Sequence, residues 1–102
     1  IRTGRQQLLC IAAQERAHQK ELQVEYFLRT GKRCVPPAAC PRLGTAVQDL
    51  RSVYTQELAL AQRLDAAADT APSPLRETLT AMAQQDRCHA QTVRNLLACL
   101  LG

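Results

Sequence analysis

The stretch LRETLTAMAQQDRCHAQTVRNLLACL, residues 75–100, carries the pattern that decides the fold. Positions at alternating spacings of three and four residues form one face of an α-helix, as in a helical bundle. This face consists of Leu75, Leu79, Met82, Asp86, His89, Val93, Leu96 and Leu100. It is apolar at both ends, and Asp86 and His89 interrupt it in the middle. The stretch therefore predicts a bundle helix that turns an acid and an imidazole towards the core.

Two earlier segments have the same kind of face. In the second segment the face consists of Val47, Leu50, Tyr54, Glu57, Ala61, Leu64 and Ala68. In the first it consists of Leu8, Ile11, Glu15, His18, Leu22 and Glu25. Each face is apolar towards the start of its helix and polar near the helix midpoint. The chain is thus predicted to hold three amphipathic helices whose core-facing sides share this pattern.

Turn and capping residues set the expected helix boundaries. The helices are predicted over residues 3–30, 43–69 and 73–100. Gly31 is the residue type that most often follows a helix end, and Pro72 ends the second helix. Ser73 is the expected N-cap of the third helix, with Pro74 at its first position. Because the connections are short, neighbouring helices are expected to be antiparallel.

Composition favours a single all-α domain over residues 1–102. One Phe, two Tyr and no Trp leave an aliphatic core, and strong helix formers dominate the chain. The net charge of +4 comes without a basic recognition helix. We therefore expect no nucleic acid as partner, and a helix-turn-helix DNA binder ranks well below the other functions. No apolar run reaches the roughly 18 residues of a membrane span, so no membrane association is expected.

The cysteines bear on the cellular compartment of the protein, and the first residue bears on whether the sequence is a fragment. Five cysteines, an odd number, together with no signal-peptide pattern, favour the reducing cytoplasm. Cys34 and Cys40 flank a proline-rich stretch, and whether they form a disulfide stays open. Because the chain begins at Ile1 rather than Met, we expect it to be a fragment or a processed chain.

The polar interruptions are expected to meet in one layer of the core. Antiparallel helices of similar length align their midpoints, and the interruptions are Glu15, His18, Glu57, Asp86 and His89. Each uncompensated buried charge costs several kcal/mol, against a total stability of about 5–15 kcal/mol. Metal ions compensate such groups, because carboxylates and imidazoles suit iron, manganese and zinc. The alternative is a metal-free polar network in which Glu57 pairs with a histidine and Tyr54 donates a hydrogen bond.

Two stretches resemble the ferritin-like superfamily, and most closely its rubrerythrin-like bacterial proteins. They are QERAHQKELQVEYFLRTGK, residues 14–32, and AQQDRCHAQTVRNLL, residues 83–97. The resemblance implies an up-down helical bundle of which this chain holds the last three helices. The family's first helix would be missing or supplied by a partner. It also implies that Glu15 and His18 are the first E-x-x-H pair and Glu57 a bridging glutamate. Asp86 and His89 fall on the second pair, with Asp86 in the place of the family's glutamate.

The resemblance further implies a di-iron oxidoreductase that oxidises ferrous iron or reduces peroxide. Two iron ions, with manganese or zinc as alternatives, would be held by Glu15, His18, Glu57, Asp86 and His89. Tyr54 would lie next to these ligands. The four-cysteine electron-transfer module of full rubrerythrins has no counterpart here, and an electron-donor protein is an expected partner. The other function that stays open is a non-catalytic helical interaction module that has lost its metal.

A second apolar stripe lies on the first helix, away from the polar interruptions. It consists of Leu9, Ala13, Ala17, Val24 and either Phe27 or Leu28. Apolar patches beyond a few hundred Å² normally mark an interface. Because two-fold pairing is the commonest assembly, the stripe predicts a homodimer.

Overall fold

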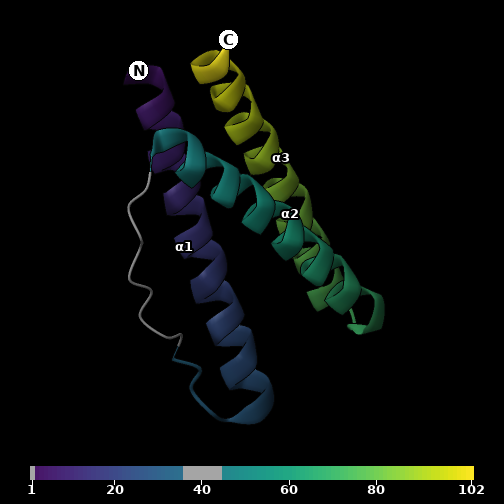
Figure 1. The fold of residues 1–102 in the computed structure, drawn as a ribbon. Helices are drawn as coiled ribbons and strands as arrows, with labels where there is room; N and C mark the ends of the chain where they lie inside the picture. Colours follow the sequence, from purple (N-terminus) through teal and green to yellow (C-terminus); the bar gives the residue numbers. More distant parts are fainter. Residues whose placement is uncertain (1, 36–44) are drawn as a thin grey trace. The chain divides into compact units, whose positions relative to one another are not determined.

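The computed structural model describes residues 2–35 and 45–102, and every regular element in these ranges is an α-helix. The helices are α1 (Arg2–Thr30), α2 (Ala46–Thr70) and α3 (Leu75–Leu101) (Figure 1). The prediction of an all-α chain with three long helices is confirmed. Within the described ranges no helix combines the length and the apolarity needed to cross a membrane. Whether Cys34 and Cys40 form a disulfide stays open, because Cys40 lies outside these ranges.

The chain divides into two units, one with α1 and one with α2 and α3. In the first unit, α1 ends as its sequence predicts. Gly31 has a φ of +71°, and its N–H donates to the carbonyl of Phe27 over 2.8 Å. Glycine adopts this left-handed conformation without steric cost, which is why it follows so many helix ends. A single domain over residues 1–102 stays a prediction.

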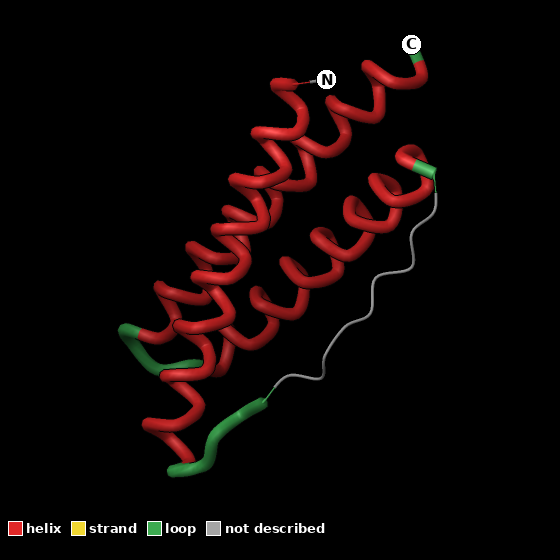
Figure 2. The backbone as a smooth tube through the Cα atoms, turned by 90° about the vertical axis from the view of Figure 1, so that its left-hand side faces the viewer, coloured by secondary structure: helices red, strands yellow, loops and turns green. Residues whose placement is uncertain are grey.

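The second unit is an antiparallel hairpin in which α2 and α3 lie side by side (Figures 1 and 2). Its buried residues are Leu50, Glu57, Ala61, Leu64 and Ala68 on α2, and Leu79, Met82, Ala83, Asp86, His89, Ala90 and Val93 on α3. Most positions of the two predicted faces are therefore buried, whereas Val47, Tyr54, Leu75 and Leu96 are half-buried and Leu100 is 47% exposed. Arg87 also donates to Asp65 across the hairpin over 2.6 Å, which favours this register of the two helices.

Two predicted helix starts are wrong, and local hydrogen bonds explain both. The second helix was expected to begin at residue 43, but Thr45 is extended and caps a helix that begins at Ala46. Thr45 Oγ1 accepts from the N–H of Gln48, and Gln48 Oε1 accepts from the N–H of Thr45. This reciprocal pair is a capping box, and T-x-x-Q is visible in the sequence.

At the third helix the predicted cap is one residue early. Pro74 is the N-cap of α3 and has no side-chain cap hydrogen bond. The Ser73 hydroxyl instead donates to Glu77 Oε1 over 2.8 Å. The serine is therefore engaged by a carboxylate of the first helical turn rather than by a backbone N–H.

Replacing Thr45 by alanine should lower the free energy of unfolding by about 0.5–2 kcal/mol, because the cap hydrogen bond is lost. The measurement is urea denaturation followed by circular dichroism. Thr55→Ala is the matched control, since the exposed Thr55 hydroxyl only donates to the carbonyl of Arg51 one turn earlier. Equal effects of the two substitutions would mean that Thr45 does not cap α2.

The Ser73 hydroxyl lowers the pKa of Glu77 below the ordinary value of a glutamate by donating to its carboxylate. Ser73→Ala should move this pKa back up, as measured by NMR titration of the Glu77 side chain. Because the folded-state pKa is depressed, the stabilisation from this contact is present above the unfolded pKa. It disappears as the pH falls through the folded pKa. Ser52→Ala is the control and should leave Glu77 unchanged; an unchanged titration in Ser73→Ala would contradict the contact.

Candidate metal centre

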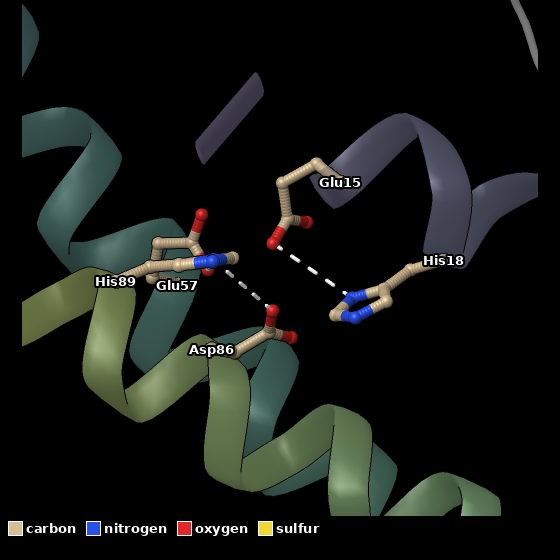
Figure 3. A network of polar contacts seen from close by, with 5 residues as sticks. All are labelled: Glu15, His18, Glu57, Asp86 and His89. Atoms are coloured by element: carbon tan, nitrogen blue, oxygen red, sulfur yellow. Dashed lines mark ion pairs between the residues drawn. The ribbon is translucent and has the colours of Figure 1, made fainter. Parts of the chain in front are cut away.

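Three ionisable side chains meet inside the α2–α3 hairpin, and we call them the hairpin cluster: Glu57, Asp86 and His89. Glu57 lies on α2, whereas Asp86 and His89 lie one turn apart on α3 (Figure 3). The three residues are 6%, 0% and 4% exposed. Carboxylates are almost never buried to this extent unless they are paired or bind a metal.

The distances within the hairpin cluster lie close to those of a metal site. His89 Nδ1 is 3.6 Å from Asp86 Oδ1 and 3.7 Å from Glu57 Oε2. One ligand atom from each residue lies within 4.8 Å of the others. Tetrahedral ligands about 2.0–2.2 Å from a metal are roughly 3.3–3.6 Å from one another. Small side-chain adjustments would therefore bring the three atoms around one ion.

The charge of the hairpin cluster also fits a cation. When both carboxylates are ionised, the three side chains together carry a negative charge whether His89 is neutral or protonated. A divalent cation would neutralise the two carboxylates and accept the imidazole nitrogen. Oxygen and nitrogen donors of this kind fit iron, manganese or zinc.

Small residues on the same helix faces allow the two helices to approach. Ala61 is one turn after Glu57 on α2, and Ala83 and Ala90 lie one turn either side of Asp86 on α3. All three alanines are at most 2% exposed. Because the distance between packed helices depends on the side chains at the contact, these alanines favour an approach that lets Glu57 reach His89. The buried roles of Ala83 and Ala90 were missed, since neither lies on the predicted seam.

The other two predicted ligands form a pair on α1. Glu15 Oε1 is 4.0 Å from His18 Nδ1, and the side chains are 28% and 13% exposed (Figure 3). The spacing of three residues puts them on the same face of the helix, as predicted. A single layer that contains all five residues stays a prediction from the sequence.

Tyr54 and Cys88 lie close to the predicted ligands in the sequence, and the structure shows how far each is buried. Tyr54 is half-buried one turn before Glu57, and its contact with a metal ligand stays a prediction. Cys88 adjoins His89 in sequence but lies off the predicted seam, and it is exposed. The hairpin cluster therefore offers oxygen and nitrogen donors and no thiolate.

No protein-family model, no curated protein and no solved structure significantly matches this chain. The hairpin cluster and the sequence pattern are therefore the observations from which a function can be argued.

Proposed function

We propose that this chain is a metal-binding helical protein of the ferritin-like, rubrerythrin-like kind. The observation that carries the proposal is the convergence of Glu57, Asp86 and His89 inside the hairpin. The carboxylate oxygens of Glu57 and Asp86 and the imidazole nitrogen of His89 are donors that suit iron, manganese and zinc.

Glu57, Asp86 and His89 would hold metal in the hairpin, and Glu15 and His18 would supply the second half of a two-iron centre. Bound iron would supply the redox chemistry for oxidising ferrous iron or reducing peroxide, with manganese or zinc as alternative occupants. The carboxylates would balance the charge of the ions, and each histidine would add one neutral nitrogen donor. Burial of the hairpin cluster would keep bulk water away from these groups.

Metal content per chain tests this proposal. Protein purified anaerobically without chelator, then offered ferrous iron, should retain stoichiometric iron after gel filtration. Glu57→Gln and His89→Ala should lose most of it and still give helical circular dichroism spectra. Asp69→Asn is the matched control, because Asp69 is an exposed carboxylate on the same hairpin. Iron-free parent protein that iron, manganese or zinc does not stabilise against heat would contradict the proposal.

The second function is an interaction module without metal, and exposed apolar residues on α1 favour it. Leu9, Val24, Phe27 and Leu28 are 59%, 56%, 49% and 71% exposed. A second copy of the chain is the partner that we propose for them. Light scattering should then report a dimer, and Val24→Ser with Leu28→Ser should shift it towards the monomer; a parent protein that is monomeric at all concentrations would contradict the homodimer.

A further inference from the structure

We propose that the groove between α1 and the segment that follows it binds a small anionic amphiphile, a molecule with an aliphatic chain and one anionic head group. The groove has a volume of about 430 Å³, and the described residues that line it are Lys20, Gln23, Val24, Phe27 and Arg33. Sites for small molecules usually have volumes of about 300–1,000 Å³. All five residues belong to the unit that contains α1, so this site goes beyond the metal-binding function and does not depend on it.

Local hydrogen bonds hold the segment after α1 against the helix. Gly31, with its φ of +71°, turns the chain where the helix ends. The side chain of Gln23 then donates to the carbonyl of Cys34 over 3.1 Å, although these residues are 11 positions apart. Because Gln23 lies about two turns before the helix end, this hydrogen bond brings the segment back along α1. Arg33 is thereby carried to the groove.

The apolar part of the groove comes from two positions of α1. Val24 and Phe27 are three residues apart, so they lie on the same face of the helix. They are 56% and 49% exposed. An aliphatic chain that covers these side chains removes apolar surface from water, and this burial favours binding.

The charged part of the groove is basic. Lys20 lies one turn before Val24 on α1, and Arg33 lies in the segment after the helix. None of the described residues that line the groove is acidic. An ammonium and a guanidinium next to apolar surface complement an anionic head next to an aliphatic chain, and a guanidinium can donate two parallel hydrogen bonds to such a head. A second copy of the chain would also cover Val24, but it would take both cations partly out of water, which costs free energy unless acidic side chains meet them.

Titration of the full ¹⁵N-labelled chain with octanoate, followed by NMR, tests this proposal. The protein is first treated with a chelator, so that the carboxylate of octanoate cannot bind to a metal ion. Saturable shifts are expected for the amide signals of residues 20–33. Octan-1-ol keeps the aliphatic chain without the charge, and acetate keeps the charge without the chain. Both should therefore bind more weakly than octanoate.

Two pairs of matched substitutions separate the groove from the rest of the surface. Arg33→Gln should weaken octanoate binding by about five- to tenfold, between the effects of an exposed ion pair and of a charged hydrogen bond. Lys32→Gln removes the same charge next to the groove and should change the affinity by less than about twofold. Phe27→Ala should weaken binding by about tenfold, because it removes apolar surface. Tyr26→Ala, at the neighbouring exposed position, should leave the affinity unchanged.

Three outcomes would overturn the proposal. Equal affinities for octanoate and octan-1-ol would mean that the two basic residues take no part in recognition. Equal losses in Arg33→Gln and Lys32→Gln would mean that only the net charge matters. A dimer in light scattering whose amide signals do not respond to octanoate would assign the groove to a second copy of the chain. None of these outcomes changes the metal content, which tests the metal-binding function separately.

Discussion

Replacing Leu64 by alanine is expected to lower the free energy of unfolding by about 2–5 kcal/mol. Leu64 lies on α2 and is 7% exposed. The substitution removes buried methyl groups and leaves a cavity that the surrounding helices fill only in part. In a domain of this size each kcal/mol corresponds to about 4–8 °C in Tm. The loss would therefore be visible in both thermal and chemical denaturation.

Leu58→Ala is the matched control for Leu64→Ala. Leu58 lies on the same helix and is 36% exposed. Its truncation should cost less than about 1 kcal/mol, as is usual for surface substitutions. The midpoint of urea denaturation is the quantity to compare, provided that the m-value is unchanged. If both substitutions cost the same, the buried face of α2 is not the one that carries Leu50, Leu64 and Ala68.

Asp86→Asn is expected to destabilise the metal-free protein and to weaken metal binding. Asp86 is 0% exposed, and its Oδ1 lies 3.6 Å from His89 Nδ1. Asparagine removes the charge of one partner of this buried pair, so the metal-free variant should be less stable than its metal-free parent. With metal, the variant lacks a charged ligand, and its affinity should fall by more than about 100-fold.

Thermal denaturation with and without Co²⁺ measures both effects of Asp86→Asn. At 100 times the dissociation constant, a bound ion adds about 2.7 kcal/mol to the stability of the parent protein. The variant should gain almost nothing at the same concentration, while Asp69→Asn should gain as much as the parent. Equal stabilisation of parent and Asp86→Asn would remove Asp86 from the ligand set. A metal-free Asp86→Asn as stable as its metal-free parent would show that the contact between Asp86 and His89 does not stabilise the hairpin.

The sequence by itself determined the helices and most of their buried faces. Alternating spacings of three and four residues specify one side of a helix, so Leu50, Leu64, Met82 and Val93 were assigned to the core correctly. The same spacing predicted that Glu57 and the Asp86–His89 pair face inwards, and all three are buried. Gly31 marked the end of α1, because few other residues adopt its positive φ without strain.

Tertiary structure alone decided how deeply each group is buried and which groups meet. A spacing pattern predicts which side of a helix a residue lies on, but not how deeply its side chain is buried. It therefore predicted the same burial for Leu100 and Val93, although these residues are 47% and 0% exposed. Ala83 and Ala90 lie beside the seam, and they are buried nonetheless. The separations of His89 from Glu57 and Asp86 depend on helix packing and rotamers, which no single-helix pattern contains. The sequence thus places the donors on inward faces, and the packed hairpin brings them within reach of one ion.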